Sequence, residues 1–340
     1  MVDPFDRPVT RVRISVTSAC NFSCFYCHRE GFLPNSSSEM RPEEIERIVR
    51  VMASLGVSRV KLTGGEPTVR PDIVEIVGRL ASISEIIDLS MVTNGSRLAK
   101  LASELKEAGL DRINVSLPSL RPDRFAHITG VSLLSEVVSG IEAAASAEFS
   151  QLKINRVILR GINQDETEEL IELARDLGAM VQLIQLEDAD PESPLLKAYG
   201  FGLQDLIGLV KELGGKLVSI RDDMQNRLVF DVRGVKVEVV GPMGNPDFCA
   251  RCTRIRITSD GRFKPCLFLE ENTVDFLRAM RAGADNDTLK ALYLRAISLR
   301  KPYFGWIIRV DEGVSEVGHQ DGGYQREERS SPSGEGQGLH

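Results

Sequence analysis

The six cysteines of this chain form two separate triplets. Three of them follow a C-x3-C-x2-C pattern near the start of the chain: Cys20, Cys24 and Cys27. The other three follow a C-x2-C-x13-C pattern far downstream: Cys249, Cys252 and Cys266. Clustered thiols in a reducing compartment indicate metal binding or catalysis rather than disulfides. Because no cysteine is left over, we expect two sites that each use three thiolates.

The first triplet is consistent with two kinds of metal site. A closed structural zinc site needs four protein ligands, and the further candidate nearby is His28, directly after Cys27. We interpret His28 as a loop residue rather than a ligand. A four-iron cluster can be held by three thiolates, which leaves one iron open to another ligand. The spacing therefore favours an iron–sulfur cluster, with zinc as the alternative.

The first triplet follows a strand-like segment in a repeating pattern of strands and helices. Segments rich in β-branched residues predict strands at 11–17, 59–63, 89–93, 112–116, 153–159 and 181–186. Helical patterns separate these strands at 42–55, 71–81, 97–108, 134–147 and 165–177. Repeated βα units imply a parallel sheet with right-handed crossovers. Because such units are too few here for a closed eight-fold barrel, we predict an α/β fold with an incomplete (β/α)6 TIM-type barrel and its chemistry at the C-terminal strand ends.

The pattern changes after about residue 200. A helix is predicted at 203–213, and alternating segments typical of antiparallel strands follow at 216–220, 227–231 and 235–240. The second triplet comes next. From about Asp311 the chain is rich in Gly, Ser, Glu and Gln, so we expect disorder there. The predicted division is therefore a barrel at 1–200, a C-terminal extension at 201–310 and a disordered tail at 311–340.

The composition is typical of a globular cytoplasmic enzyme. Of the 340 residues, 42% are hydrophobic, which is enough for a substantial core. The formal net charge of −7 argues against general nucleic-acid binding, so an anionic ligand would need a local basic pocket. The start of the chain has no signal-peptide pattern, and no run of about 18 apolar residues occurs. We therefore expect a cytoplasmic protein with neither nucleic acid nor membrane as a partner.

The first triplet resembles the signature of radical S-adenosylmethionine enzymes, which has an aromatic residue before the last cysteine, here Tyr26. Gly64-Gly65-Glu66-Pro67, after the second predicted strand, is similar to the GGEP segment of that family. The resemblance implies a [4Fe-4S] cluster whose open iron binds S-adenosylmethionine and whose electron cleaves it to a 5′-deoxyadenosyl radical. It also implies that Tyr26, Gly65 and Ser116 contact S-adenosylmethionine.

The second triplet resembles a narrower family. The segment "CARCTRIRITSDGRFKPC" at 249–266 is similar to the auxiliary-cluster segment of GTP 3′,8-cyclases, and the similarity runs from about Arg7 to Pro302. It implies a second [4Fe-4S] cluster whose open iron meets the guanine of GTP. Positions that match GTP-binding groups of the family are Arg13, Lys61, Val92 or Thr93, Lys153, Arg254, Ile255 and Arg256. Arg254 and Arg256 alternate along one strand, so both should face the same side.

The activity implied by this resemblance is a step of molybdenum cofactor (molybdopterin) biosynthesis. The radical would abstract the C3′ hydrogen of GTP, and the C3′ radical would attack C8 of guanine. Reduction and protonation of the resulting aminyl-type radical would give (8S)-3′,8-cyclo-7,8-dihydroguanosine 5′-triphosphate, and the enzyme would be a lyase. The implied partners are an electron donor and a downstream cyclic pyranopterin monophosphate synthase, and a homodimer is left open. The sequence assigns no general acid or base.

Two departures from the family keep alternatives open. Lys61 stands where many relatives carry Arg. The lysine keeps the positive charge but lacks the planar guanidinium group that can bind two phosphate oxygens at once. The family usually ends in a double glycine that reaches the active site, whereas Gly322-Gly323 continues here to His340. We therefore expect this chain to cleave S-adenosylmethionine and to cyclise GTP poorly. The alternatives are a peptide-modifying radical enzyme with an auxiliary cluster and an inactive iron–sulfur relative, and turnover of GTP separates them.

Overall fold

The computed structural model describes residues 1–28 and 39–302, which belong to one compact unit. At its centre six parallel strands lie side by side in chain order: β1 (Arg11–Ser15), β2 (Arg59–Thr63), β3 (Asp88–Thr93), β4 (Arg112–Ser116), β5 (Gln151–Ile158) and β6 (Met180–Gln185). The predicted tail at 311–340, with Gly322 and Gly323, lies outside the described residues. The α/β class with a mainly parallel sheet is confirmed.

Later strands extend this sheet at both ends. Beyond β6 lie β9 (Val235–Val240), β8 (Arg227–Val232) and β7 (Lys216–Arg221). Beyond β1 lie β10 (Arg254–Ile257), β11 (Arg262–Lys264) and β12 (Val274–Asp275). β9 is parallel to β6 and β10 is parallel to β1, while the outer pairs are antiparallel. The antiparallel strands expected after residue 200 are therefore present, and they continue the same sheet.

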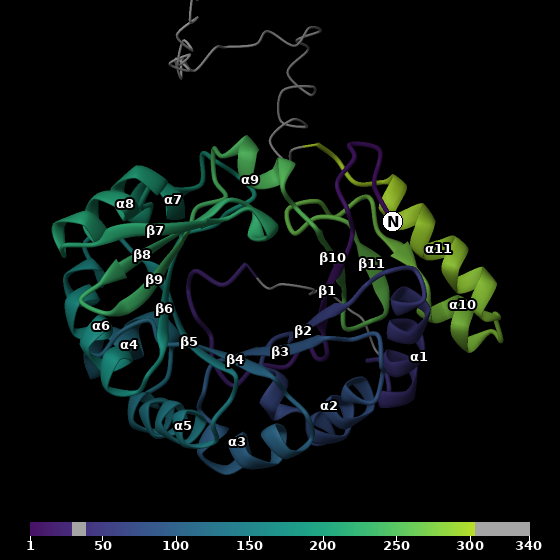
Figure 1. Cartoon of the computed structure of the whole chain (residues 1–340), viewed down its shortest axis with the longest axis horizontal. Coiled ribbons are helices and arrows are strands. Elements are labelled where there is room, and N and C mark those ends of the chain that lie inside the picture. Colours follow the sequence, from purple (N-terminus) through teal and green to yellow (C-terminus); the bar gives the residue numbers. More distant parts are fainter. Residues whose placement is uncertain (29–38, 303–340) are drawn as a thin grey trace, which may run out of the picture. The chain divides into compact units, whose positions relative to one another are not determined.

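Helices between the strands cover the outside of the curved sheet (Figure 1). Those that follow strands β1 to β6 are α1 (Pro42–Ala53), α2 (Ile73–Ala81), α3 (Leu98–Glu107), α4 (Pro122–Thr129), α5 (Leu134–Ser146), α6 (Thr167–Asp176), α7 (Pro194–Tyr199) and α8 (Leu203–Glu212). The remaining helices are α9 (Pro246–Ala250), α10 (Leu277–Arg281) and α11 (Asn286–Ser298), with short 3-10 turns η1 (Pro67–Val69), η2 (Gln164–Glu166) and η3 (Asp222–Met224). Among the described helices, none alone has the length and apolar composition to cross a membrane, and only the bent pair α4 and α5 meets those criteria together.

The predicted helices and strands are confirmed, with ends that move by a few residues. The first strand stops at Ser15 because the cysteine loop begins soon after it. Helix α4 was not predicted, although two boundary signals flank it. Pro122 occupies its first turn, and Gly130 follows its end with a positive φ of 73°. Its eight residues carry too short a periodic pattern to predict a helix.

The parallel strands alternate polar and apolar residues, although parallel strands buried on both faces are usually apolar throughout. In β1, Val12 and Ile14 are buried and belong to the main apolar core. Arg11 and Arg13 alternate with them and therefore point to the opposite face of the sheet. The apolar face packs against the helices, and the polar face lines the pocket described below.

Strand register brings cations level with one another on this inner face. Arg13 is level with Lys61 of β2 and with Arg256 of β10. Two residues earlier, Arg11 is level with Arg254. Because side chains two residues apart on a strand point to the same face, these cations form two adjacent layers.

Candidate active site

The first cysteine triplet lies on the loop that follows β1. The backbone amide of Cys27 donates to the carbonyl of Cys24 at 3.0 Å, and the amide of Phe22 donates to Cys20 Sγ at 3.4 Å. Burial raises the pKa of Cys24 to about 12, and the nearby thiols of Cys27 and Cys20 act in the same direction. The thiols of Cys20 and Cys27 are therefore close enough to that of Cys24 to affect its ionisation.

Helix α4 holds this loop through its C-terminal end. The amide of Ser23 donates to the carbonyl of Thr129 at 2.9 Å, and the amide of Phe25 donates to the carbonyl of Ile128 at 3.1 Å. The last carbonyls of a helix have no partner within the helix, so they are available for such contacts. The position of the cysteine loop therefore depends on the position of α4.

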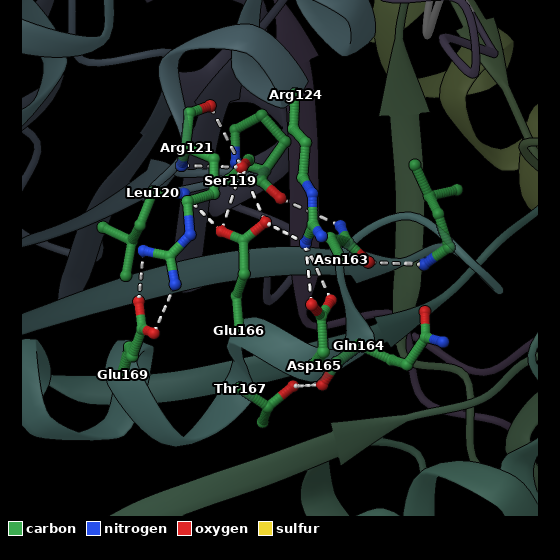
Figure 2. Close-up of polar contacts among 12 residues, drawn as sticks. Ser119, Leu120, Arg121, Arg124, Asn163, Gln164, Asp165, Glu166, Thr167 and Glu169 are labelled. Atoms are coloured by element: carbon green, nitrogen blue, oxygen red, sulfur yellow. Dashed lines mark hydrogen bonds and ion pairs between the residues drawn. The ribbon is translucent and has the colours of Figure 1, made fainter.

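A buried carboxylate fixes the other end of α4 (Figure 2). Glu166, at the end of η2, is only 1% exposed. It accepts hydrogen bonds from Ser119 Oγ at 2.9 Å, from the amide of Leu120 at 2.6 Å and from Arg124 Nη1 at 2.9 Å. Arg124 lies on α4 and also pairs with Asp165 at 2.8 Å. These contacts, which we call the Glu166 network, tie the start of α4 to η2.

The GGEP segment packs directly on the backbone between β1 and the cysteines. The amide of Gly65 donates to the carbonyl of Thr17, and the amide of Glu66 donates to the carbonyl of Ala19, both at 2.8 Å. A Cβ on Gly65 would collide with the Ala19 carbonyl oxygen. Only glycine therefore allows this close approach, which brings the segment beside the first triplet.

Glu66 organises the residues below the GGEP segment. Its buried carboxylate accepts from Thr68 Oγ1 at 2.5 Å, from Thr93 Oγ1 at 2.6 Å and from the amide of Asn94 at 2.6 Å. Burial raises the pKa of Glu66, and these donors oppose the effect. Since the Thr93 hydroxyl is used in this way, Thr93 lies under the GGEP segment and not among the residues that line the pocket.

Tyr26 lies between two cysteines of the first triplet, and Ser116 lies at the C-terminal end of β4. The Tyr26 ring meets Phe25 edge-on, with 5.8 Å between centroids, and packs on a small apolar cluster that includes Ile128. Burial raises the pKa of Tyr26, so its hydroxyl stays neutral and able to donate. Ser116 ends β4 level with Asn155 of β5.

A strongly cationic pocket lies on the inner face of the sheet. Ten Arg and Lys residues line it: Arg11, Arg13, Arg59, Lys61, Arg112, Lys153, Arg221, Arg227, Arg254 and Arg256. The acidic residues on its wall are Asp88 and Glu187. Cys249, Cys252 and Cys266 line the same pocket. In a chain of net charge −7, this concentration of positive charge indicates a site for a polyanion.

Several guanidinium donors in the pocket have no partner among residues 1–28 and 39–302. They are Nε of Arg11, Nε of Arg227 and Nη2 of Arg254. A buried donor left unsatisfied costs about 1–3 kcal/mol, which an anionic ligand would recover. Burial, followed by the charges of Arg13 and Arg112, lowers the pKa of Lys61 well below its ordinary value. Bringing these cations together therefore costs stability, and a bound polyanion would relieve that cost.

Glu238 is the counter-ion that the sequence did not reveal. Its side chain is fully buried on β9, forms an ion pair with Lys153 and accepts from Gln182 Nε2 at 2.8 Å. Arg221 and Arg227 lie at 3.4 and 3.7 Å from its Oε1. Burial raises the pKa of Glu238, but Arg227 and Lys153 outweigh this effect and lower the pKa to about 2. Lys153 therefore faces the pocket with its charge already partly balanced.

The second cysteine triplet is assembled from two segments. Cys249 lies in α9, Cys252 follows one turn later with its amide donating to the Cys249 carbonyl at 3.0 Å, and Cys266 follows β11. Burial raises the pKa of Cys252, but Arg300 and Arg254 outweigh it and lower the pKa. Burial raises the pKa of Cys266. The cations on this side thus favour at least one thiolate, the form that binds metal.

Three thiols per triplet fit an iron–sulfur cluster by the chemistry of the donor set. Within residues 1–28 and 39–302, no group of three or more His, Cys, Asp or Glu residues is placed to hold a single metal ion. In a four-iron cluster each thiolate binds a different iron atom. Each triplet would hold one iron–sulfur cluster. The first triplet lies beside the GGEP segment, and the second lies on the pocket wall.

The structure brings together five of the predicted GTP contacts: Arg13, Lys61, Lys153, Arg254 and Arg256 line the pocket. Val92 and Ile255 are not among its lining residues, and the Ile255 side chain is buried in the apolar core. Five further cations on the wall were missed: Arg11, Arg59, Arg112, Arg221 and Arg227. Arg11 and Arg59 could have been predicted from strand periodicity, because each lies two residues before a predicted contact on the same strand and therefore points to the same face.

Comparison with known proteins shows the family of this chain. A family model described as "Radical SAM superfamily" matches residues 14–174, and one described as "Molybdenum Cofactor Synthesis C" matches residues 179–306. The matches and the fold define this chain as a radical S-adenosylmethionine protein. A "Probable GTP 3′,8-cyclase" of Thermococcus kodakarensis is 44% identical over 308 residues, covering 89% of this chain and 99% of the relative. The protein of the same name from Pyrococcus abyssi is 45% identical over 311 residues, with the same coverage. The chain therefore belongs to the GTP 3′,8-cyclase family.

Solved structures share the fold at low sequence identity. Streptococcus suis SuiB bound to precursor peptide SuiA superposes with a TM-score of 0.60 and 18% identity, covering 77% of this chain and 60% of that one. Native anSMEcpe with bound AdoMet gives a TM-score of 0.56 and 19% identity, covering 76% and 74%. At these identities the similarity concerns the fold alone.

Proposed function

We propose that this chain is a radical lyase that converts GTP to (8S)-3′,8-cyclo-7,8-dihydroguanosine 5′-triphosphate in molybdenum cofactor biosynthesis. The observation that carries the proposal is the shared wall of one pocket, where the second cysteine triplet meets ten cations. A triphosphate supplies the charge that these cations need, and the open iron of a three-thiolate cluster supplies a place for the base. Membership of the cyclase family supports the same reaction.

The proposed architecture is an incomplete (β/α)6 TIM-type barrel at 1–200 with a C-terminal extension at 201–310. In a closed barrel of this type, layers of branched apolar side chains fill the interior. Here the inner face carries charged and amide side chains, such as Arg13, Lys61 and Asn114, so it is suited to line a substrate cavity rather than a packed core. β9 and β10 flank the six parallel strands. β10 contributes Arg254 to the wall of that cavity, and β9 contributes Glu238, which pairs with the lining residue Lys153.

In the first site Cys20, Cys24 and Cys27 would hold a [4Fe-4S] cluster, with S-adenosylmethionine on its open iron. When bound, the cluster supplies the electron that cleaves S-adenosylmethionine to a 5′-deoxyadenosyl radical. Gly65 would offer its close-packed backbone to S-adenosylmethionine, and Tyr26 and Ser116 would contact it through their hydroxyls. The role of these groups is to orient the molecule, because the cofactor carries out the difficult chemistry.

In the second site Cys249, Cys252 and Cys266 would hold another [4Fe-4S] cluster. Arg13, Lys61, Arg254 and Arg256 would bind the triphosphate, and the arginines can grip phosphate oxygens in pairs. Lys153, balanced by Glu238, would contribute a weaker attraction. Val92, Thr93 and Ile255 stay predicted contacts. Anchoring both ends of GTP fixes C3′ relative to the first site, which is the protein's main contribution to the rate.

The proposed partners follow from the chemistry. An external donor must supply electrons to the first site, and a cyclic pyranopterin monophosphate synthase would consume the product. We place the protein in the cytoplasm, where thiols remain reduced. A homodimer stays a prediction.

Anaerobic reconstitution followed by product analysis tests the proposal. The loaded protein, mixed with GTP, S-adenosylmethionine and a strong reductant, should form 5′-deoxyadenosine together with a smaller amount of a cyclised nucleotide. A protein that holds both clusters but forms 5′-deoxyadenosine without a cyclised nucleotide would contradict the proposal and favour the inactive relative.

A further inference from the structure

We propose that Asp3, Arg7 and Arg300 form a positioning network that holds the second cysteine triplet and sets the charge around its cluster. We call these three residues the Asp3 network. This inference rests on the proposed second cluster. None of the three belongs to the triplet or to the pocket wall, so their arrangement is not explained by substrate binding.

The network is a buried carboxylate shared by two guanidinium groups. Arg7 Nε donates to Asp3 Oδ2 at 2.8 Å, and Arg300 Nη1 lies 3.0 Å from the same oxygen. The exposed fractions of the side chains are 0% for Asp3, 7% for Arg7 and 2% for Arg300. Buried charges are costly unless they are paired, so the ion pairs of the Asp3 carboxylate with both guanidinium groups stabilise this arrangement.

Each arginine of the network also holds the backbone of one cysteine. Arg7 Nη1 donates to the carbonyl of Cys249 at 2.9 Å, and Arg300 Nη2 donates to the carbonyl of Cys252 at 2.6 Å. The two carbonyls lie on either side of the C-x2-C turn. Arg7 Nη2 also donates to the carbonyl of Lys301 at 2.7 Å, which ties the segment after α11 to the same point. Residues from the two ends of the described chain thus clamp the two cysteines.

The charge of the Asp3 network has a definite sign. Two guanidiniums and one carboxylate leave one net positive charge beside the thiolates. Positive charge in a buried site favours the more negative state of a cluster, which is the reduced state, and reduction potentials of such clusters respond to nearby charge and hydrogen bonds. Loss of an arginine charge should therefore make the potential of the second cluster more negative, and loss of the Asp3 charge should make it less negative.

This pair of opposite shifts separates positioning and charge from a merely structural role. Arg7, Asp3 and Arg300 also fasten the start of the chain to the segment after α11, so any substitution should lower the melting temperature of the apoprotein. If the three residues only stabilised the fold, every variant would lower the melting temperature and none would shift the potential in a direction set by charge. The Asp3 network predicts a potential that moves in opposite directions for Arg300→Gln and Asp3→Asn.

The test uses the reconstituted full chain and a Cys24→Ala version in which only the second cluster contributes. Iron content and the midpoint potential from an EPR-monitored redox titration are measured for Arg300→Gln, Arg300→Lys and Asp3→Asn. We expect a more negative potential and faster iron loss to a chelator in Arg300→Gln, a potential near the parent value in Arg300→Lys, and a less negative potential in Asp3→Asn. Arg47→Gln is the matched control, because Arg47 also donates to a distant carbonyl, that of Ala284 at 2.6 Å.

Three results with the variants would overturn the inference. Arg300→Gln and Asp3→Asn could shift the potential in the same direction or leave it unchanged, or Arg47→Gln could shift it as much. If Arg300→Gln does not fold, Asp3→Asn still tests the direction of the shift, and Arg300→Lys still tests that the potential is kept when the charge is kept. A parent protein that holds the first cluster and no second one would overturn both the proposed second cluster and this inference. A parent with both clusters and unresponsive variants would overturn this inference alone.

Discussion

The two cysteine triplets have the same number of ligands and opposite kinds of support. The first lies on a loop held by backbone hydrogen bonds to α4, and the GGEP segment beside it carries the buried carboxylate of Glu66. The second lies on the pocket wall, and guanidinium groups hold its backbone. The first site therefore suits a cationic cofactor such as S-adenosylmethionine, whereas the second suits an anionic substrate.

The largest expected effects come from removing one thiol on each side. Cys24→Ala should abolish cleavage of S-adenosylmethionine and leave the second cluster bound. Cys252→Ala should remove the second cluster and all cyclisation, while some uncoupled cleavage of S-adenosylmethionine survives. Iron analysis and quantification of 5′-deoxyadenosine measure both. The comparison fails if either variant loses both clusters, since the two sites would then depend on one another.

The buried carboxylate of the second site should control stability in a pH-dependent way. The pKa of Glu238 is lowered to about 2 from an ordinary value near 4.5, so its contribution is present above about pH 4.5 and is lost as the pH falls toward 2. A change of that size corresponds to about 3 kcal/mol. Glu238→Gln should therefore lower the free energy of unfolding by about 3 kcal/mol at neutral pH. Urea unfolding at pH 7 and below pH 4 checks this, and an equal loss at both pH values would contradict it.

The cationic wall should bind GTP without affecting the first site. Arg254→Ala removes a charge-assisted contact worth about 1.5–3 kcal/mol, so GTP affinity should fall about ten- to a hundred-fold. Both clusters and the cleavage of S-adenosylmethionine should be retained. Arg233→Ala is a suitable control, because Arg233 is exposed and pairs with Glu168. Unchanged GTP affinity in Arg254→Ala would return this residue to a purely structural role.

The smallest effect is expected at the Glu166 network. Glu166→Gln keeps the size and removes the charge that pairs with Arg124, so the free energy of unfolding should fall by about 1–2 kcal/mol. Iron should leave the first cluster faster in the presence of a chelator, while the second keeps its iron. Glu169→Gln, in an exposed pair with Arg121, should change stability by less than about 0.5 kcal/mol. Faster iron loss from both clusters would show that α4 does not act on the first loop alone.

The sequence predicted the first site better than the second, for a physical reason. Strand periodicity and the eight-residue cysteine segment are local, so β1, its loop and the GGEP segment could be placed from contiguous residues. The register that aligns Arg13 with Lys61 and Arg256 is not local, because it depends on which strands pair. Arg254 and Arg256 were predicted only through their alternation and the family resemblance.

Several supports could not be predicted at all. Glu238 is one of two charged residues in a strand that otherwise consists of valines, and only the packing of β9 beside β6 places it near Lys153. The Asp3 network joins residues almost three hundred positions apart, and a single Asp or Arg near a chain end normally indicates a solvated surface. The Glu166 network likewise depends on α4, a helix too short to be recognised from its pattern.

The central claim is that the second triplet holds a cluster that meets GTP in the cationic pocket. The most direct test is the EPR spectrum of the reduced Cys24→Ala protein, in which only the second cluster contributes, titrated with GTP. We predict a GTP-dependent change in that spectrum that saturates with the measured affinity and that requires higher GTP concentrations after Arg254→Ala. An unchanged spectrum at GTP concentrations that saturate binding would contradict the account.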